Sequence, residues 1–309
     1  MTRHFLRDDD LNPSEQREVL ELALEFKRNR LYARPFEGPK AVALLFDKPT
    51  LRTQVSFTVG VAELGGHPLL VDGNLAQIGV RESVADTAKV LGRQVSAIVW
   101  RTFEQSRLEE MAANVDVPVV NALTDSFHPC QVLADLASIA YAKGGLDALP
   151  GLKLAYIGDG ANNMAHSYLL GGATAGVHVT IATPPTFLPN DTIFADAEEL
   201  AVRTGGSVRI VHDPAEAVSG ADVVATDTWV SMGTEEERDA REKAFEGFQV
   251  TEDLMALASP DAVVIHCLPA YRGKEITTGV LDGPQSIVWE EAEFRLHAQK
   301  AILTWLVEQ

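Results

Sequence analysis

The chain has 309 residues, 46% of them hydrophobic, and a mean hydropathy of zero; at roughly 150 residues per domain, this predicts two globular domains. Its formal net charge of −18 argues against nucleic-acid binding, which normally needs a basic face, although a few arginines in a cleft can still attract a small anion. The chain has two cysteines and no Cys-x-x-Cys pair, which excludes a disulfide framework and a cysteine-rich zinc site. No apolar run reaches the ~20 residues that are needed to cross a bilayer.

In the first half of the chain, short apolar runs alternate with stretches of helical spacing. The apolar runs predict strands at Ala41–Phe46, Pro68–Val71, Ala97–Trp100 and Val117–Asn121. The helical stretches lie near Thr53–Leu64, Ser83–Leu91, Gln105–Ala113 and Gln131–Ala142. Alternation of this kind predicts a parallel sheet with helices on both faces.

The second half repeats the pattern, with strands predicted at Leu152–Ile157, Val177–Ala182, Ser207–Val211, Asp222–Thr226 and Ala262–Ile265. The predicted fold is therefore α/β, with two domains that each contain a parallel sheet with helices on both faces, and with the active site in the cleft between them. We expect the domains to span residues 1–142 and 150–290, on either side of the breaker-rich segment KGGLDALPG. A C-terminal helix is predicted from the spacing of apolar residues over Glu291–Leu306, and residues 291–309 are expected to pack back on the first domain.

The charged run GTEEERDAREKAF (Gly233–Phe245) is either a solvated loop or helix, or a mobile lid.

Polar motifs gather directly after the predicted strands. They are Thr50–Thr53, Arg101–Thr102 and DSFHPCQ (Asp125–Gln131) in the first half, and GDGANN (Gly158–Asn163), DTWVSMG (Asp227–Gly233) and HCLPAYRG (His266–Gly273) in the second. In open parallel sheets, ligands bind at the carboxyl ends of the strands. If the two halves face each other, these six loops would meet in one cleft.

The stretch DKPTLRTQVSF (Asp47–Phe57) follows the first strand and opens a helix. Thr50 is well placed as an N-cap, which would leave the backbone N–H groups of the next turn pointing outward. Together with Arg52, that helix N-terminus predicts a phosphate or carboxylate site. Taken alone, the segment fits a capped helix with a surface ion pair better than it fits an anion site. Its place at a strand end, among five other polar loops, favours the anion site instead.

Three further side chains of the first half suit a phosphate with a carbonyl beside it. Arg101 offers a second guanidinium, although a surface ion pair would explain it equally well. His128 offers an imidazole and Gln131 an amide one helical turn later, although a histidine before a proline is more often structural. The combination, rather than any single residue, predicts the phosphate site.

The second half offers the opposite electrostatics. Asp227, Ser231 and the paired amides of Asn162 and Asn163 suit an ammonium group or an amino-acid backbone. Cys267 follows the last strand, and the sequence leaves it open as a nucleophile, a polar contact or a buried structural thiol. Because the His-Cys pair there lacks further ligands at metal spacing, no metal site is expected.

Taken together, LRT after the first strand, HPCQ, GDGANNMAHS, DTWVSMG and HCLPAYRG resemble the aspartate/ornithine carbamoyltransferase family. The resemblance runs nearly end to end, from HFLRDDDL to EAEFRLHAQKAIL. HPCQ is similar to the wider family, whereas SMG and HCLP together are similar to its ornithine branch. The resemblance implies transfer of the carbamoyl group of carbamoyl phosphate to the δ-amine of L-ornithine, giving L-citrulline and phosphate, in arginine biosynthesis and without a cofactor or metal.

The resemblance also implies the residues of the site. The catalytic residues would be Arg52, Arg101, His128, Asp227 and Cys267. Carbamoyl phosphate would contact Thr50, Leu51, Arg52, Thr53, Gln77, Arg101, His128, Pro129, Cys130, Gln131, Cys267, Leu268 and Arg295. Ornithine would be held by Asn163, Asp227, Ser231 and Met232. The family's homotrimer implies that Gln77, in the loop GNLAQIG, acts in the site of a neighbouring subunit.

The chemistry agrees with these implied roles. Arg52, Arg101 and the helix N-terminus would neutralise the leaving phosphate while His128 polarises the carbonyl. The attacking amine must be neutral, although a free alkyl ammonium titrates near ~10. Asp227 would orient the α-ammonium, and Cys267 beside the δ-nitrogen would help to select the unprotonated form. A covalent carbamoyl intermediate on this thiol is not needed.

One segment departs from the family pattern S-T-R-T-R-x-S-F-E, because this chain has TLRTQVSFT. Thr50 keeps a hydroxyl, and Leu51 can still offer its backbone N–H. Gln54 and Thr58 replace an arginine and a glutamate at positions i and i+4, where such a pair stabilises a helix by only about 0.2–0.5 kcal/mol. We infer that the lost arginine was largely a structural partner and that Arg52 and Arg101 retain the phosphate clamp.

Several alternatives remain at the level of sequence. A carbamoyltransferase for putrescine, N-acetylornithine or aspartate would share most motifs, but Asp227 favours free ornithine because putrescine lacks an α-ammonium. A nicotinamide-dependent dehydrogenase would share the strand–helix alternation, but GDGANN has Asn163 where the GxGxxG pattern needs its third glycine. A non-catalytic binding protein is disfavoured by the full set of polar groups. Since MTRHFLRDDD does not resemble a signal peptide, we expect a cytoplasmic protein without nucleic-acid or membrane partners.

Overall fold

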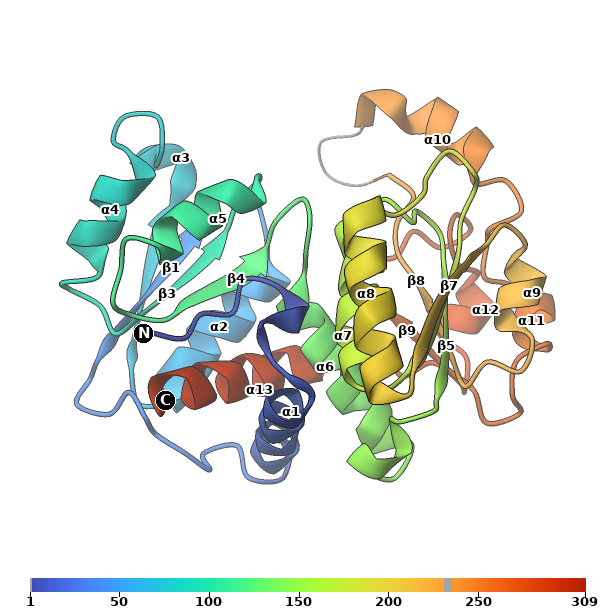
Figure 1. Ribbon diagram of the computed structural model, residues 1–309, viewed down its shortest axis with the longest axis horizontal. Coiled ribbons are helices and arrows are strands. Elements are labelled where there is room, and N and C mark those ends of the chain that lie inside the picture. The colour runs from blue at the N-terminus through green and yellow to red at the C-terminus, as the bar shows by residue number, and fades with distance from the viewer. Residues whose placement is uncertain (1, 231–234) are drawn as a thin grey trace. The chain divides into compact units, whose positions relative to one another are not determined.

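The computed structural model describes residues 2–230 and 235–309 of the chain. It contains two compact units, unit 1 (Met1–Ala137 and Glu293–Gln309) and unit 2 (Ser138–Ala292), and each is built around one parallel sheet (Figure 1). The predicted α/β class is confirmed. All nine predicted strands are present in the described residues, and their ends lie within two residues of the predicted ones.

Unit 1 has a four-stranded parallel sheet in the order β2-β1-β3-β4. Its strands are β1 (Ala41–Phe46), β2 (His67–Asp72), β3 (Ala97–Arg101) and β4 (Val119–Leu123). Its helices are η1 (Asp8–Asp10), α1 (Pro13–Arg28), α2 (Arg52–Glu63), α3 (Gly73–Ala76), α4 (Val84–Leu91) and α5 (Gln105–Ala112), together with parts of α6 (Pro129–Ala142) and α13 (Val288–Val307). The central strands read AVALLF and AIVWR without polar alternation because both of their faces are buried.

Unit 2 has a five-stranded parallel sheet in the order β7-β6-β5-β8-β9. Its strands are β5 (Lys153–Ile157), β6 (His178–Ala182), β7 (Ser207–Val211), β8 (Val223–Thr226) and β9 (Val263–His266). Its helices are η2 (Leu146–Ala148), α7 (Asn163–Thr174), α8 (Asp191–Thr204), α9 (Pro214–Val218), η3 (Glu235–Glu237), α10 (Arg238–Ala244), α11 (Glu252–Met255) and α12 (Thr278–Leu281).

Helices cover both faces of each sheet (Figure 1). In unit 1, α4 and α5 pack on the face that carries Leu45 and Trp100, while α2 packs against β1 and β2 from the other face. The C-terminal helix α13 is tied to α2 by the ammonium of Lys300, which donates to Glu63 Oε2 at 2.7 Å. In unit 2, α9, α11 and α12 share a buried cluster with Ile157 on one face, and α7 and α8 cover the other.

Helix α1 was not among the predicted elements, although its start has a clear sequence signal. Asn12 Oδ1 accepts from the N–H groups of Ser14 and Glu15, and Glu15 Oε2 accepts from the N–H of Asn12. Pro13 occupies the first helical position. This capping box with a leading proline fixes the start of the helix locally.

The predicted N-cap at Thr50 is wrong. Helix α2 starts at Arg52, and the flanking residue is Leu51, which already has right-handed helical dihedrals (φ −96°, ψ −58°). The carbonyl of Leu51 accepts the helical bond from Val55 N at 2.9 Å. Within the described chain, no side chain caps the first turn. The N–H groups at the start of α2 therefore point away from the helix without an internal partner.

The charged run of the sequence is helical over η3 and α10, and Gly233 lies outside the described residues. Residues 236–240 are exposed, as expected of a solvated segment. Arg241 is different, because it is buried and both of its terminal nitrogens donate to Asp159 Oδ2, at 3.1 and 2.9 Å. The run is therefore a solvated helix with one buried arginine.

The glycines of GDGANN serve the packing of their own turn. A Cβ on Gly160 would lie 2.6 Å from the carbonyl oxygen of Phe187, and Gly158 has a φ of 147°, which side chains rarely adopt. Gly160 is thus needed because the backbone passes very close to another segment, and Gly158 because of its backbone conformation.

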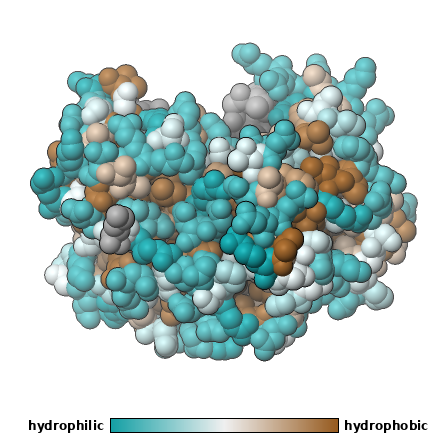
Figure 2. All heavy atoms as spheres, viewed as in Figure 1, coloured by the Kyte–Doolittle hydropathy of each residue, from teal (hydrophilic) through white to brown (hydrophobic). Residues whose placement is uncertain are grey.

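Hydrophilic residues cover most of the face drawn in Figure 2, with hydrophobic residues visible only in small patches. None of the helices in the described part of the chain combines the length and apolar character needed to cross a membrane.

Candidate active site

The sheet orders identify where ligands should bind in each unit. In unit 1 the chain leaves β1 toward β2 on one side and later returns to β3 on the other, so the switch point lies between β1 and β3. In unit 2 the corresponding point lies between β5 and β8. Ligands of open α/β sheets bind at the carboxyl ends of the strands at such switch points. Of the predicted residues, Arg52 follows β1 and Arg101 is the last residue of β3, while Asn163 and Asp227 follow β5 and β8.

At the switch point of unit 1, two guanidinium groups converge on one hydroxyl. Thr53, in the first turn of α2, accepts from Arg101 Nη1 at 3.4 Å and from Arg295 Nη2 at 3.1 Å. Thr53, Arg101 and Arg295 are all buried, whereas Arg52 beside them is exposed. Two cations at the positive end of a helix, with outward N–H groups, are the arrangement expected of an anion site.

His128 lies next to this anion site, directly before α6. Burial lowers the pKa of His128 well below its ordinary value, and the positive charges of Arg295 and Arg101 lower it further. The imidazole is therefore neutral near pH 7. A neutral ring can donate to a carbonyl oxygen without adding a third positive charge.

Gln131, Pro129 and Cys130 begin helix α6 and are buried. Gln131 Oε1 accepts from Arg295 Nη1, and Gln131 Nε2 donates to Asp135 Oδ1 at 2.7 Å, which fixes the orientation of the amide. The thiol of Cys130 donates to a backbone carbonyl at 3.3 Å, and burial raises its pKa to about 12. Only the main chain of Cys130 is left for the predicted contact with carbamoyl phosphate.

The loop that carries Gln77 is attached to the same sheet edge. Gln77 is exposed and has a φ of 49°, in the left-handed region that non-glycine residues seldom adopt. Arg107 donates to the carbonyl of Ile78 and pairs with Asp47 at 3.4 Å. Asp47 in turn accepts from the hydroxyl of Thr102 at 2.6 Å. The base of the Gln77 loop is thereby linked to the ends of β1 and β3.

At the switch point of unit 2, the carboxylate of Asp227 collects three donors. Its Oδ1 accepts from Thr228 N at 2.7 Å and from Cys267 Sγ at 3.1 Å, and its Oδ2 accepts from Asn162 Nδ2 at 3.3 Å. Burial raises the pKa of Asp227, and the neighbouring His266 and the hydrogen bonds from Cys267 and Thr228 counter that effect. A buried carboxylate held in this way suits an ammonium group as its counter-charge.

Asp227, His266 and Cys267 place three potential metal ligands within 4.8 Å of one another. Both ring nitrogens of His266 are already engaged, however. Nδ1 accepts from Leu268 N at 3.0 Å, and Nε2 bonds to Glu275 Oε1 at 3.0 Å. A metal ion would have to displace one of these buried hydrogen bonds, so the donor set does not fit a resident metal.

Not every predicted ornithine contact can be described. Ser231 and Met232 lie outside the described residues. Asn163 is half-buried at the first position of α7, and Asn162 caps that helix by accepting from Ala165 N at 2.9 Å.

Two family models match the chain, one for each half. The model for the carbamoyl-P binding domain of aspartate/ornithine carbamoyltransferase matches residues 3–141, and the model for the Asp/Orn binding domain matches residues 150–306. The chain belongs to the aspartate/ornithine carbamoyltransferase family.

Similar proteins and structures agree with this family assignment. The ornithine carbamoyltransferases of Clavibacter sepedonicus and Bifidobacterium longum subsp. infantis are each 60% identical to the chain. The alignments cover 100% of both chains in the first case, and 98% of this chain and 95% of the relative in the second. The solved structure of ornithine carbamoyltransferase from Pyrococcus furiosus has a TM-score of 0.93 at 44% identity, covering 98% of this chain and 96% of that one. The anabolic enzyme from Campylobacter jejuni also has a TM-score of 0.93, at 36% identity, with 99% of both chains covered.

Two buried residues that contact the predicted ones were not singled out from the sequence. Tyr156, inside β5, has a hydroxyl that accepts from Asn162 Nδ2 at 2.9 Å, and burial raises its pKa well above the usual value. Glu275 is buried against His266, as described above. No local sequence signal marks Glu275, because its burial depends on the tertiary fold. Tyr156 does have a signal, because it lies two residues before GDGANN and brings a hydroxyl to the end of a predicted strand.

The departure from the family pattern at positions 54 and 58 leads to a first prediction. Gln54 is exposed, and Thr58 is half-buried with no partner for its hydroxyl among the described residues. Gln54→Arg should therefore leave the affinity for carbamoyl phosphate nearly unchanged, because the residue points to solvent. Calorimetric titration would check this, and a gain of about tenfold, or about 1.4 kcal/mol, would mean that a ligand contact had been lost with the arginine.

The double variant Gln54→Arg, Thr58→Glu is the matched control for the structural interpretation. It restores the i, i+4 pair and should raise helix stability by only about 0.2–0.5 kcal/mol, again without changing the affinity for carbamoyl phosphate.

Proposed function

We propose that this protein transfers the carbamoyl group of carbamoyl phosphate to the δ-amine of L-ornithine, giving L-citrulline and phosphate. The observation that carries the proposal is the convergence of Arg101 and Arg295 on Thr53, beside a neutral His128. Residues 1–142, with 291–309, would bind carbamoyl phosphate, and residues 150–290 would bind ornithine. The two family models support the division between the halves at residues 3–141 and 150–306, and the placing of residues 291–309 with the first half rests on the packing of α13 against α2.

On the phosphate side, the start of α2 and the arginines that surround it act as electrostatic catalysts. Arg52, Arg101, Arg295 and the free N–H groups of α2 hold the phosphate of the substrate. Their positive charge counts most as the C–O bond to phosphate breaks and the leaving group takes the electron pair. The neutral imidazole of His128 donates to the carbonyl oxygen, where negative charge develops during attack.

On the amine side, Asp227 binds the α-ammonium and thereby aligns the side chain of ornithine. The δ-nitrogen attacks the carbonyl carbon and forms the new C–N bond, and the proton that it loses is taken up by the leaving phosphate. Cys267 beside Asp227 offers this nitrogen a neutral thiol instead of a second carboxylate, which favours the uncharged amine. The two half-sites serve one reaction only if they face each other, and this arrangement is part of the proposal.

An assay across acceptors tests the proposed function directly. Purified protein would be given carbamoyl phosphate and, in parallel, ornithine, putrescine, N-acetylornithine or aspartate, and phosphate release and carbamoylated product would be measured. Ornithine should give the highest kcat/KM. A higher value with another acceptor would contradict the ornithine assignment while keeping the family, and no turnover with any acceptor would contradict transfer altogether.

The second prediction concerns the effect of replacing Cys267 on turnover of ornithine. Cys267→Ala should lower kcat/KM for ornithine by roughly tenfold without abolishing turnover, because the thiol contributes one hydrogen bond to a charged acceptor. Cys267→Ser keeps a donor for Asp227 and should lie closer to the parent enzyme. Complete loss of activity in a folded Cys267→Ala protein would instead indicate a covalent carbamoyl intermediate.

We also propose that the working enzyme is a homotrimer in which Gln77 acts in a neighbour's site. Strand β2 is at the edge of its sheet and has half-exposed Leu69 and Leu70, while Leu51 and Val55 on the adjoining helix are 72% and 52% exposed. Apolar side chains along a sheet edge favour burial against another chain. Sedimentation equilibrium would measure the assembly, and a monomer that is active at high dilution would contradict the proposal.

We place the reaction in the cytoplasm and in arginine biosynthesis. Formation of citrulline from ornithine supplies a precursor of arginine, and two cysteines that are not joined in a disulfide suit a reducing compartment.

A further inference from the structure

The turn that carries Cys267 has a strained backbone that one histidine helps to hold. Leu268 has a φ of 58°, in the left-handed region that is costly for a branched side chain. Its N–H donates to His266 Nδ1 at 3.0 Å, and the N–H of His266 donates to Glu291 Oε2 at 2.8 Å. Strained conformations persist only where surrounding contacts fix them, and they gather at functional sites.

This hydrogen bond determines the protonation of His266. A backbone N–H can only donate, so Nδ1 must be without a proton, and Nε2 must carry the proton of the neutral ring. Nε2 faces Glu275 Oε1 at 3.0 Å, and so it donates to that carboxylate. Protonating Nδ1 would break the bond to Leu268. His266 and Glu275 therefore form a neutral–charged hydrogen bond rather than an ion pair.

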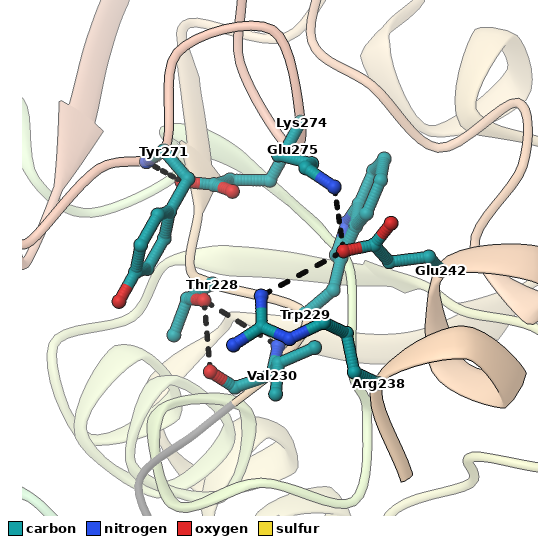
Figure 3. Close-up of a pocket in the computed structure, with 8 residues that line it drawn as sticks. All are labelled: Thr228, Trp229, Val230, Arg238, Glu242, Tyr271, Lys274 and Glu275. Atoms are coloured by element: carbon teal, nitrogen blue, oxygen red, sulfur yellow. Dashed lines mark hydrogen bonds and ion pairs between the residues drawn. The ribbon is translucent and has the colours of Figure 1, made fainter. Parts of the chain in front are cut away.

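Glu275 is itself held rigidly. Its Oε1 also accepts from Tyr271 N at 2.6 Å, and its backbone carbonyl accepts from Val250 N at 2.8 Å. The residue is 1% exposed. Its Oε2 has no partner among the described residues, and Glu275 lines a small pocket with Tyr271 and Lys274, shown in Figure 3. The pocket volume of about 20 Å³ has room for about one water molecule.

We propose that Glu275 is a positioning residue of the ornithine half-site, acting through His266. Glu275 fixes His266 as the Nε2–H tautomer, Nδ1 of that tautomer holds the N–H of Leu268, and the resulting turn directs the thiol of Cys267 to Asp227. Neither Glu275 nor His266 touches substrate in this scheme. The inference rests on the proposed function, because the consequence for catalysis is measured with ornithine.

Variants at Glu275 separate its role as an acceptor from its charge. Glu275→Gln keeps an acceptor for His266 Nε2–H and Tyr271 N–H, so kcat/KM for ornithine should fall by less than about tenfold. Glu275→Ala removes the acceptor, and misplacing the turn should cost roughly 10²-fold. KM for carbamoyl phosphate should change little in both. Equal losses in the two variants would overturn the proposal.

Glu242→Gln is the matched control, because Glu242 lines the same pocket but pairs with Lys274 at the surface (2.6 Å; Figure 3). It should leave both substrates unaffected. If Glu242→Gln lowered kcat/KM for ornithine as much as Glu275→Gln, any change in this pocket would have the same effect, which would contradict the proposed role of Glu275.

Variants at His266 test the second link. His266→Asn places an amide oxygen near the position of Nδ1, so it can still accept from Leu268 N–H, whereas His266→Gln places its amide near Nε2 and loses that acceptor. We expect His266→Asn to retain more activity with ornithine than His266→Gln. The reverse order would show that the bond to Leu268 does not matter.

The tautomer can be measured without any reference to activity. Solid-state NMR of the whole protein labelled with ¹³C,¹⁵N-histidine would show each ring nitrogen as protonated or bare, and the signal absent from His266→Asn would identify residue 266. A bare Nδ1 and a protonated Nε2 are expected at neutral pH, with the tautomer preserved in Glu275→Gln. An imidazolium or the opposite tautomer would overturn the inference, even if the acceptor assay confirms the proposed function.

Discussion

Arg101→Met is expected to lower kcat with carbamoyl phosphate by about 10²–10³-fold, the usual cost of removing one electrostatic donor from a transition state. Arg101 is 6% exposed at the end of β3, and its guanidinium reaches the hydroxyl of Thr53 at the start of α2. Because charge on the leaving phosphate grows as its bond to carbon breaks, the loss should appear in kcat as well as in KM. Steady-state kinetics at saturating ornithine would measure both.

Methionine keeps the apolar stem of the arginine but removes its charge, so packing around β3 should be preserved. Arg93→Met is the matched control, because Arg93 is exposed after α4 and donates only to a backbone carbonyl of its own turn. That variant should have unchanged kinetics. If Arg101→Met kept kcat/KM within about threefold of the parent in a protein with the parent's melting temperature, Arg101 would not act on the phosphate.

The strands could be predicted because they are buried on both faces. AVALLF, which forms β1, is apolar without interruption, and a parallel strand between two helical layers requires just that composition. The edge strand β2 was predicted as well, although none of its residues is fully buried, because its β-branched and aliphatic residues lie between a Gly-Gly pair and another glycine. Topology then follows, since alternating strands and helices permit few arrangements.

The start of helix α2, at the candidate site, was harder to predict from the sequence than the strands were. Thr50 was a reasonable N-cap because a side-chain oxygen is favoured there, but Leu51 adopts a helical conformation and moves the start of α2 by one residue. The preference for threonine is worth only about 1 kcal/mol, so packing of the turn can override it. The expected anion site does not depend on that cap, because its N–H groups belong to the residues that follow.

The partners of the predicted residues could not be found from the sequence. Arg295 was expected from the resemblance, but its two bonds join Thr53 and Gln131, which are 242 and 164 residues away along the chain. Glu275 lies nine residues from His266, a spacing that matches neither a helix nor a strand. Such pairs are set by tertiary packing, and one sequence contains no record of them.

Arg241→Met is expected to destabilise unit 2 by about 3–5 kcal/mol, because it leaves a buried carboxylate without its counter-charge. Side-chain exposure is 11% for Arg241 and 4% for Asp159, and the guanidinium carbon also lies 5.0 Å from the ring centroid of Phe187. At about 2–4 °C per kcal/mol, the melting temperature should fall by roughly 6–20 °C. Thermal unfolding followed by circular dichroism would measure the change.

Two further variants separate the charge from the packing. Arg241→Met combined with Asp159→Leu removes both charges, and most of the stability should return, since apolar replacement of a buried pair is often neutral. Arg209→Met removes an ion pair whose partners are 50% and 55% exposed, and it should shift the melting temperature by at most about 4 °C. If Arg241→Met behaved like Arg209→Met, the buried pair would not contribute to stability.

The pH dependence of the Arg241→Met variant gives an independent check with a defined sign. Burial raises the pKa of Asp159, and the backbone bond from Ala161 and the charge of Arg241 counter that effect. Without the arginine, the folded-state pKa rises further above the unfolded value, so the folded protein binds more protons than the unfolded chain. Stability then falls as pH rises through the interval between the two pKa values and stays low above it. The difference in melting temperature between the parent and Arg241→Met should therefore be small near about pH 4, close to the unfolded pKa of an aspartate, and larger near about pH 8, whereas a difference independent of pH would indicate lost packing rather than an uncompensated charge.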